Sequence, residues 1–471
     1  MLDLLTITEK RNYELKLASN GVPKSIYETI SAFANTDGGT IVLGVEENRP
    51  TNKIVGVNHP EQYKKDILNT VHNKSKFSYP LLDDDNFQIL EYEGLKVLLI
   101  NVPEDPKNLK PIYLNNNYFD SFGRSDEGDY HLTQSQIKYY LNDNSDDSYD
   151  LMPNVKKYGY EDVNISTLHN YRKELDETYP NNIFSALPDE EFLLKTGLLV
   201  LDENKAKVLT NAAVILLTDF TKITSIFPTY LLDYQRIVSN NSKWDNRIVS
   251  DEPTWSGNLF DFYQLVFADL YRDIPASYVS DNGKNIGKSL MVDCFKEALA
   301  NAFSNHSFYL SVPLKIVRTA NELRVRNSGK MLVDKSRAIL GGISKVRNQG
   351  IITFFRRIGV ADRTGTGVPK MFSAMEKNGY QEPQLIEESL PEDFTTLVLS
   401  FTSKTSVNIE IENKLISYVR SIGNSGASIT QIAEHLNVSR QYASALVSKL
   451  IKENILMDNN KLTKGRLIFV K

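Results

Sequence analysis

Runs of apolar residues alternate with amphipathic segments over the first third of the chain. The strand-like runs are TIVLGV (40–45), FQILEYEG (87–94) and LKVLLINV (95–102), and the helical pattern LTQSQIKYYL (132–141) follows them. Apolar residues at every second position indicate strands, and those at every third or fourth position indicate helices. The pattern predicts a first domain over residues 1–141. The acidic stretch LNDNSDDSYD comes next and predicts a linker over 142–153.

The middle of the chain mixes helical and strand-like segments. Residues 161–200 and 258–272 have helical patterns, VLTNAAVILL (208–217) fits a buried strand or a short helix, and TYLLDYQRI (229–237) fits a strand. No chemistry can be assigned to these segments, and we group them as a connecting region over 154–285.

Two further domains are predicted after the connecting region. Residues 286–405 combine a strong helix at 289–306, a hairpin-like pair of strands in LKIVRTANELRVRNSG (314–329) and Gly-rich loops. Residues 409–471 begin with helices and end with short strand-like pieces. Helices and strands intermixed over several domains predict an α/β (α+β) multidomain fold.

Composition narrows the class of protein. At 471 residues the chain is too long for one core, and no apolar run reaches the length of a membrane span. The start, MLDLLTITEKRNYELK, lacks the basic and apolar regions of a signal peptide. The only cysteine, Cys294, excludes an intramolecular disulfide framework and a cysteine-based zinc site. These features predict a cytoplasmic protein without a membrane partner.

Charge is spread unevenly along the chain. The net charge is −5, yet residues 412–471 hold nine Lys and Arg against four Asp and Glu. A basic C-terminal module on an acidic body indicates a polyanion as the partner of that end.

The helix at 289–306 carries a column of polar residues. Met291, Phe295, Leu299 and Ala302 form its apolar stripe, whereas Glu297, Asn301 and Asn305 lie four residues apart on another face. One carboxylate above two carboxamides suits a hydrated Mg²⁺ ion, and the carboxylate could orient a water molecule. A solvated helix face would show the same spacing.

Two glycine-containing loops follow this helix in the sequence. A strand leads into Asn327-Ser328-Gly329, and Gly365-Thr366-Gly367 comes just before another helix. Glycines at a helix N-terminus let backbone N–H groups approach a phosphate. Arg347 and Lys370 could add positive charge there.

The ordered motifs E-A-L-A-N-A, N-S-G and G-T-G resemble the GHKL ATPase family, and in particular its branch named after the RecG-like C-terminal ATP-binding domain. The resemblance implies that Glu297 activates water and that Asn301 binds Mg²⁺ with ATP. The adenine-contacting Asp of that family is Asn327 here, and the second glycine of its D-x-G-x-G motif is Met331. The other predicted nucleotide contacts are the motif residues Gly329, Gly365, Thr366 and Gly367, together with Asn305, Arg347 and Lys370.

The N-terminal region resembles the Schlafen-type AlbA_2 domain. The resemblance lies in EKRNYELK (9–16), AFANTDGGTIVLGV (32–45), Gly56 and FGRSDEG (122–128). In the second motif, Gly38-Gly39 can adopt positive φ and make a tight reversal. Eukaryotic Schlafens cleave tRNA and rRNA with acidic residues of this region, whereas bacterial AlbA_2 proteins are mostly described as DNA-binding or transcription-related.

The strand YELKL has one apolar face and one charged face, so Glu14 and Lys16 point the same way. If the Asp-Gly-Gly reversal brings the strands together, Glu9, Glu14 and Glu46 could converge beside Lys16. Such carboxylates would hold Mg²⁺ or Mn²⁺ against a phosphodiester as catalytic residues of a nuclease. Alternatively, Glu14 and Lys16 form an exposed pair, and Glu47 takes the place of Glu46.

Residues 428–456 have a helix-turn-helix pattern. Ser428 and Ser439 are placed to cap two helices, and KLTKGRLIFVK (461–471) would form the wing of a winged helix. Its use in protein contacts alone is the alternative. The predicted nucleic-acid contacts are Ser439, Arg440, Gln441, Tyr442, Lys449, Lys464 and Arg466.

Three functions fit this sequence. The first is an ATP-responsive, DNA-binding transcriptional regulator. The second is a metal-dependent nuclease, gated by ATP and acting on tRNA or DNA in phage defence. The third is an oligomeric scaffold with a decayed nucleotide site. The GHKL resemblance also implies a homodimer or a larger homo-oligomer.

Overall fold

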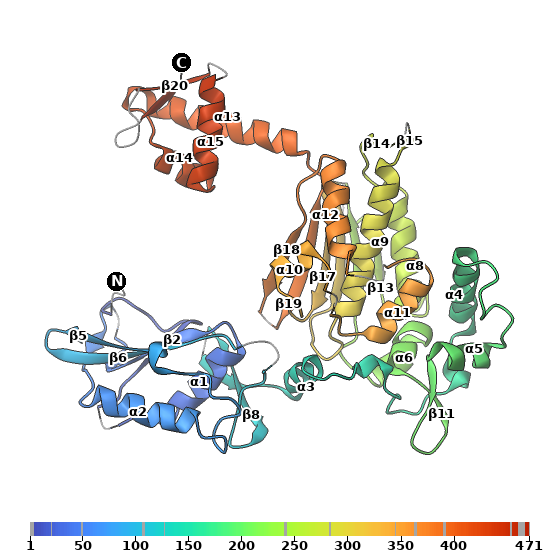
Figure 1. Ribbon diagram of the computed structural model, residues 1–471, viewed down its shortest axis with the longest axis horizontal. Helices are drawn as coiled ribbons and strands as arrows, with labels where there is room; N and C mark the ends of the chain where they lie inside the picture. Colours follow the sequence, from blue (N-terminus) through green and yellow to red (C-terminus); the bar gives the residue numbers. More distant parts are fainter. Residues whose placement is uncertain are drawn as a thin grey trace. The chain divides into compact units, whose positions relative to one another are not determined.

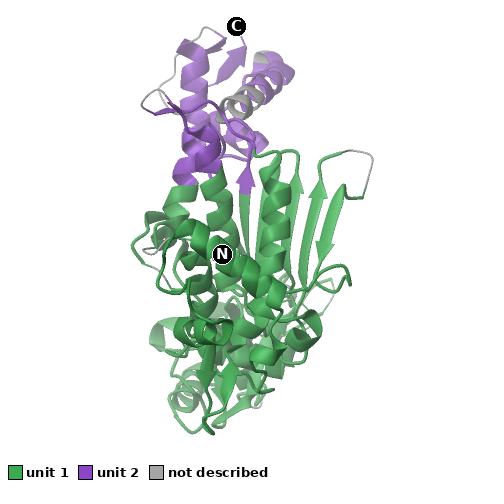
Figure 2. Cartoon of the chain, turned by 90° about the vertical axis from the view of Figure 1, so that its right-hand side faces the viewer, with its two compact units in different colours: residues 1–274, 292–371, 384–398 green, residues 275–291, 372–383, 399–471 purple. Residues whose placement is uncertain are grey.

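The computed structural model describes residues 4–19, 21–48, 50–105, 109–126, 128–239, 243–281, 284–343, 345–361, 365–389, 392–452, 455–459 and 467–470, with side chains left undescribed at 404–410 and 424. The chain divides into two compact units (Figure 2). Unit 1 holds residues 1–274, 292–371 and 384–398, and unit 2 holds residues 275–291, 372–383 and 399–471. Helices and mixed sheets occur together, which confirms the predicted α/β class.

The N-terminal part of unit 1 is built on a four-stranded sheet with the order β1-β2-β6-β5 (Figure 1). Its strands are β1 (Tyr13–Lys16), β2 (Gly39–Leu43), β5 (Phe87–Tyr92) and β6 (Leu95–Val102). β1 runs parallel to β2, and the other neighbours are antiparallel. The three apolar runs predicted to be strands thus form β2, β5 and β6.

Two helices pack on this sheet, α1 (Ile26–Asn35) and α2 (Pro60–Val71). Ile30 and Phe33 of α1 and Ile67 of α2 are fully buried in one core with apolar residues of β2 and β6. The shorter elements of this part are β3 (Val45–Glu46), β4 (Lys53–Ile54), η1 (Asp84–Asn86), β7 (Tyr113–Leu114), β8 (Asn117–Ser125) and β9 (Gly128–His131).

The Asp-Gly-Gly segment makes the predicted reversal and joins α1 to β2. Gly38 has φ +72°, and a Cβ there would lie 2.8 Å from the backbone nitrogen of Glu104 and the carbonyl oxygen of Val102. A side chain at residue 38 would therefore clash with rigid backbone. Asp37, the residue before, is left at the surface of the turn, 44% exposed.

Asp105 follows β6 and is a buried carboxyl group with an unusual pKa. Its side chain is 4% exposed, and no described residue hydrogen-bonds its Oδ2. Burial raises its pKa to about 6, since the charged form loses its hydration, although Lys110 opposes this shift. The stability that this raised pKa contributes is present below about pH 4 and is lost as pH rises through about 6.

We expect Asp105→Asn to increase the free energy of unfolding by roughly 1 to 2 kcal/mol above pH 6, because an amide cannot ionise. Urea unfolding between pH 4 and pH 8 measures the effect. The gain should shrink towards pH 4, and a gain that is equal at every pH would contradict the explanation.

The segment after residue 141 differs from the predicted linker. α3 (Gln134–Asp143) extends into it, and η2 (Tyr149–Leu151) follows. Asp143 is buried against Arg347, and Asp150, also buried, accepts a hydrogen bond from the backbone N–H of Ile351 at 2.9 Å. Asp143 and Asp150, two acidic residues of the predicted linker, are therefore buried hydrogen-bond acceptors rather than solvated charges.

The connecting region contains η3 (Tyr160–Asp162), α4 (Ile165–Thr178), α5 (Asp189–Thr196), β10 (Leu199–Leu201), β11 (Lys207–Leu209), α6 (Asn211–Leu217) and α7 (Phe220–Thr224). VLTNAAVILL becomes the end of β11 and the short helix α6. Thr210 caps α6, since its Oγ1 accepts a hydrogen bond from the backbone N–H of Ala213 at 3.2 Å. Every residue of α6 is buried, which explains its unbroken apolar pattern.

A six-stranded sheet with the order β13-β12-β16-β17-β19-β18 forms the other half of unit 1. Its strands are β12 (Leu232–Ile237), β13 (Asn246–Val249), β16 (Leu314–Thr319), β17 (Glu322–Ser328), β18 (Gln384–Glu388) and β19 (Phe394–Ser400). The predicted hairpin is β16 and β17. β12 and β13 come from the predicted connecting region, so this region completes the sheet.

Helices pack beside this sheet (Figure 1). They are α8 (Leu259–Tyr271), α9 (Gly287–Asn305), α10 (Lys335–Leu340), α11 (Gln349–Arg357) and α12 (Gly367–Lys377). Phe303 of α9 holds three helices together, because its ring centroid lies 6.4 Å from that of Phe262 in α8 and 5.4 Å from that of Phe355 in α11. Cys294 is buried in α9, and burial raises the pKa of its thiol to about 12.

Unit 2 contains the C-terminal helices and two short hairpins. Its elements include β14 (Ser280–Asp281), β15 (Lys284–Asn285), α13 (Lys404–Ile422), η4 (Gly423–Ser425), α14 (Ile429–Leu436), α15 (Arg440–Lys452), β20 (Leu456–Asp458) and β21 (Ile468–Val470). Ile432 of α14 and Val447 of α15 are fully buried in one core with Leu415 of α13. Within the described ranges, no helix combines the length and apolar character that crossing a bilayer requires.

Candidate functional site

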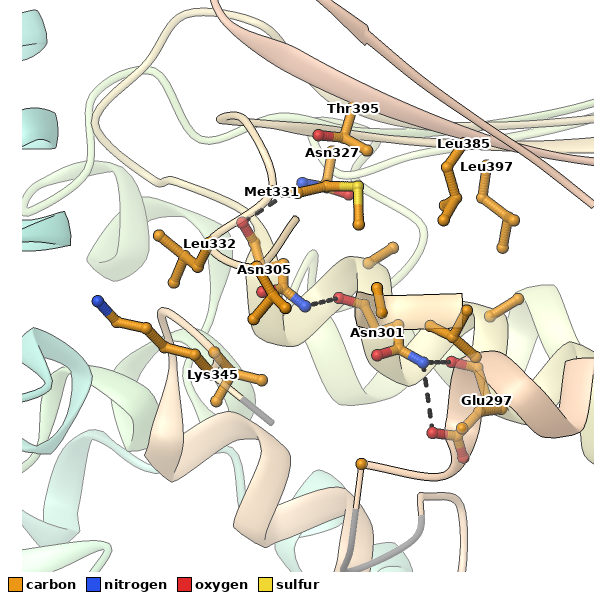
Figure 3. A pocket seen from close by; sticks show the side chains of 18 of the residues that line it. Glu297, Asn301, Asn305, Asn327, Met331, Leu332, Lys345, Leu385, Thr395 and Leu397 are labelled. Atoms are coloured by element: carbon orange, nitrogen blue, oxygen red, sulfur yellow. Dashed lines mark hydrogen bonds between the residues drawn. The ribbon is translucent and has the colours of Figure 1, made fainter. Parts of the chain in front are cut away.

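A pocket of unit 1 lies between α9, the strands β17, β18 and β19, and the first turn of α12 (Figure 3). It contains roughly 1010 Å³ of empty space, a volume that includes the open solvent at its mouth. Apolar side chains such as Leu385 and Leu397 cover the sheet side, and the polar column of α9 faces them.

Glu297, Asn301 and Asn305 all line this pocket, so the predicted column faces a cavity rather than bulk solvent. Asn301 donates from Nδ2 to the carbonyl oxygen of Glu297 at 2.9 Å and to its Oε1 at 3.3 Å. Asn305 likewise donates from Nδ2 to the carbonyl oxygen of Asn301 at 2.9 Å. Because both nitrogens bond to the helix itself, the carboxamide oxygens are the groups presented to a ligand.

The predicted G-T-G loop lies against this column. Gly365 and Gly367 line the pocket, and Gly365 has φ +64°, which favours glycine. A Cβ on Gly367 would lie only 1.8 Å from Oε1 of Glu297, so the carboxylate touches the start of α12. Thr366 and Lys370 are not among the lining residues, and residues 362–364 lie outside the described residues.

Asn327 lines the sheet side of the pocket, where the family resemblance expects an adenine contact. Its Nδ2 donates to the carbonyl oxygens of Asn305 at 3.3 Å and Ser328 at 3.1 Å. This arrangement fixes the amide orientation and presents Oδ1 as an acceptor. Thr395, a neighbour in the lining, donates from Oγ1 to the carbonyl oxygen of Gly329 at 2.9 Å.

The structure does not place Arg347, a predicted nucleotide contact, in the lining of this pocket. Its side chain is 1% exposed and forms a two-pronged pair with Asp143, at 2.8 Å from Nε to Oδ1 and 2.6 Å from Nη2 to Oδ2. Nη1 donates to the carbonyl oxygen of Asn305, and Nη2 also donates to that of Lys330. The guanidinium is therefore committed beneath the pocket.

Gly329, another predicted nucleotide contact, is also absent from the pocket lining. It has φ +89°, and a Cβ would lie 2.7 Å from the guanidinium carbon of Arg347. Its role is to make room for that side chain.

Lys330 and Lys345, which were not predicted from the sequence, do line the pocket. The position of Lys330 directly after N-S-G was the available signal.

In the N-terminal domain, the structure brings together only part of the predicted acidic cluster. Glu14 lies 2.7 Å from the ammonium of Lys16 and 2.6 Å from the guanidinium of Arg124, as measured from its two carboxylate oxygens. Arg124 also bonds Asp129 at 2.9 Å. Glu14 and Lys16 are thus neighbours, as predicted, but in a half-buried ionic network.

Glu46 does not join this network, contrary to the prediction. It pairs with Lys53 at 3.8 Å across β3 and β4, whereas the backbone N–H of Glu9 donates to Oε1 of Glu47 at 3.3 Å. Burial, together with Glu14 and Glu47, raises the pKa of Glu9. No three His, Cys, Asp or Glu side chains of the described ranges form a metal-holding group, so the predicted metal site of Glu9, Glu14 and Glu46 is not assembled.

The C-terminal helices match their predicted pattern. Ser428 Oγ accepts from the backbone N–H of Gln431 at 3.3 Å, and Ser439 Oγ accepts from that of Tyr442 at 3.2 Å, so both serines cap helices. Arg440, Gln441 and Tyr442 are exposed at the start of α15. Lys449 is exposed too and pairs with Glu412 at 2.6 Å. Lys464 and Arg466 lie outside the described residues.

Comparisons with known families agree with two of these regions. Residues 9–133 match the family described as "Schlafen, AlbA_2", and residues 313–399 match "Putative ATP-dependent DNA helicase recG C-terminal". Residues 138–233 match a domain of unknown function, DUF8451. The predicted combination of a Schlafen AlbA_2 domain with a RecG-type C-terminal domain is confirmed.

Two solved structures are similar to this chain, one over nearly its whole length and one over a quarter of it. The DIP2311 protein of Corynebacterium diphtheriae is 17% identical with a TM-score of 0.42, over 98% of this chain and 92% of that one. The N-terminal domain of a RecG-related protein from Nitrosomonas europaea is 29% identical with a TM-score of 0.22, over 25% of this chain and 80% of that one. No curated protein matches the chain.

Proposed function

We propose that this chain, which joins a Schlafen AlbA_2 domain to a RecG-type C-terminal domain, is an ATP-binding transcriptional regulator that binds DNA. The observation that carries the nucleotide part is the meeting of the Glu297 column with the G-T-G glycines in one pocket. Oxygen donors opposite a helix N-terminus suit a magnesium-bound polyphosphate.

The residues fit ATP and Mg²⁺ in distinct roles. The carboxamide oxygen of Asn301, with that of Asn305, would hold Mg²⁺, which neutralises phosphate charge when bound. Backbone N–H groups after Gly365 would meet the phosphates, and Oδ1 of Asn327 would accept from the amino group of adenine. Glu297 would take a proton from an attacking water molecule.

Isothermal titration of the full chain with a non-hydrolysable ATP analogue and Mg²⁺ tests nucleotide binding directly. Asn301→Ala should weaken binding at least about tenfold when Mg²⁺ is present, because a cation ligand is removed. Asn321→Ala, at an exposed turn outside the pocket, is the matched control. A wild-type chain that binds no nucleotide would support the scaffold alternative instead.

Gly367→Ala should slow ATP hydrolysis by roughly 10- to 100-fold, because the added methyl displaces the Glu297 carboxylate by an ångström or more. The carboxylate is the end of a flexible side chain, so thermal stability should change little. Phosphate release measures the effect. Adding Gly367→Ala to a Glu297→Gln chain should produce no further loss, and an additive loss would contradict the explanation.

The DNA part of the proposal rests on the C-terminal module, which we interpret as a winged helix. Arg440, Gln441 and Tyr442 occupy the exposed start of a well-capped second helix, the position from which a recognition helix reads the major groove. We expect Arg440→Ala to weaken binding of a labelled DNA duplex about tenfold at fixed salt. Arg420→Ala, on the exposed side of α13, should not change it more than about twofold.

A metal-dependent nuclease remains the second candidate, because the AlbA_2 match includes Glu9, Glu14 and Lys16. Incubation with labelled tRNA and with duplex DNA in Mn²⁺ tests it. Cleavage that Glu14→Gln abolishes, with DNA binding retained, would establish the enzyme.

Light scattering of the same preparation tests the predicted homodimer or larger homo-oligomer.

A further inference from the structure

Lys330 lines the pocket, and its ammonium pairs with carboxylates of the N-terminal domain of unit 1. Its side chain is 10% exposed. Its ammonium lies 2.9 Å from Oε1 of Glu104 and 3.3 Å from Oδ1 of Asp37. A single side chain therefore contacts both the candidate nucleotide site and the Asp-Gly-Gly turn.

The backbone around Lys330 is held by side chains that lie outside the pocket lining. Its N–H donates to the hydroxyl of Tyr139 at 3.1 Å, and its carbonyl oxygen accepts from Arg347 at 2.6 Å. The next residue, Met331, lines the pocket and donates from its N–H to Oε1 of Glu387 at 2.8 Å. A ligand that displaces this backbone also displaces the point from which the Lys330 side chain reaches its two carboxylates.

Asp37 continues the connection into the N-terminal domain. Its Oδ2 lies 2.7 Å from the guanidinium of Arg11, and its Oδ1 accepts from Oγ of Ser389 at 3.1 Å. Although burial opposes it, Lys330 and Arg11 hold the pKa of Asp37 below its usual value, so the carboxylate is charged at neutral pH. Arg11 stands two residues before β1, the strand that carries Glu14 and Lys16.

Glu104 anchors the same ammonium to the base of the turn. Lys110, whose side chain is 1% exposed, pairs with Glu104 at 2.9 Å and donates to the carbonyl oxygens of Asn35 and Thr36. These carbonyls end α1 and begin the Asp-Gly-Gly reversal. Both carboxylates that hold Lys330 are thereby fixed to the turn.

We propose that Lys330 couples nucleotide occupancy of the pocket to the Asp-Gly-Gly turn and the charged strand of the AlbA_2 domain. The inference rests on the proposed nucleotide binding. A phosphate-bearing ligand competes for the ammonium and shifts the wall that carries it, which changes the hold on Asp37. By linkage, a ligand of the N-terminal domain changes nucleotide affinity by the same factor.

Hydrogen–deuterium exchange of the full chain, with and without a non-hydrolysable ATP analogue and Mg²⁺, tests this coupling. The reporters are the amides of Gly38 and Thr40, which bond the carbonyl oxygens of Phe33 and Asn12, each at 2.9 Å. In the wild type, nucleotide should change their exchange rate at least about fivefold.

Lys330→Met keeps the apolar stem in the pocket wall and removes the charge, and Asp37→Asn removes the partner charge. In both variants the nucleotide-dependent change should fall below about twofold, measured at a nucleotide concentration that titration shows to saturate that variant. Lys207→Met, which removes a lysine of an exposed pair with Glu190 in the connecting region, should behave like the wild type.

The outcomes separate the two proposals. A turn that responds equally in Lys330→Met, or that fails to respond in a nucleotide-bound wild type, overturns the coupling and leaves the nucleotide site intact. A wild type that binds no nucleotide overturns both the site and the coupling.

Discussion

Glu297→Gln will bind Mg²⁺ and ATP like the wild type and hydrolyse ATP about 100- to 10,000-fold more slowly, the range expected for loss of a general base. Glutamine keeps the shape of the side chain and an oxygen that can accept the 3.3 Å hydrogen bond from Asn301. An amide cannot take a proton from water at neutral pH. Titration measures binding, and steady-state phosphate release measures hydrolysis.

Two results that differ from this expectation would assign another role to Glu297. Equal hydrolysis in wild type and variant would show that this carboxylate is not the base. Weakened binding at saturating Mg²⁺ would place it among the metal ligands instead. Glu376→Gln, a change of the same kind on α12 outside the pocket lining, controls for nonspecific effects on turnover.

Arg347→Met should destabilise the protein by about 3–5 kcal/mol, the cost of leaving a buried partner charge unpaired. Asp143 would lose two short hydrogen bonds, and the carbonyl oxygens of Asn305 and Lys330 would lose a donor. Chemical unfolding with a fluorescence or circular dichroism signal measures the change.

A matched pair of controls separates burial from charge. Arg324→Met removes the exposed partner of Glu322 on strand β17. This change should lower the free energy of unfolding by less than about 1 kcal/mol. Asp143→Asn combined with Arg347→Met should recover part of the lost stability, because the orphaned charge is gone. If Arg347→Met keeps wild-type stability but loses nucleotide affinity, the guanidinium is a ligand contact after all.

The order and type of many elements could be predicted from the sequence. β2, β5 and β6 are recognisable because each is a compact apolar run, and α9 because its apolar positions recur at helical spacing. The serines before α14 and α15 are recognisable because capping depends on a local hydrogen bond. All of these signals lie within a few neighbouring residues.

Which residues and strands pair with one another across long stretches of sequence could not be predicted. Arg347 and Asp143 are separated by 204 positions, and their pairing leaves a predicted nucleotide contact outside the pocket lining. The six-stranded sheet recruits β12 and β13 from a region whose strands gave no hint of their neighbours. Such contacts depend on topology, which local periodicity does not encode.

A one-residue ambiguity explains the error at the acidic cluster. Side chains alternate along an extended segment, so Glu46 and Glu47 leave it in different directions. Glu46 turns to Lys53, and Glu47 reaches the backbone of Glu9. The sequence places an acid after β2 but does not decide which of the two acids faces β1.

The chemistry of Cys294 has a practical consequence for spectroscopy. The thiol is buried, it is the only one in the chain, and its raised pKa keeps it protonated at neutral pH. Maleimides react with exposed thiolates, so Cys294 of the native protein should not be labelled by them. A single cysteine introduced on an exposed surface could then carry a fluorophore or spin label without prior removal of the native one.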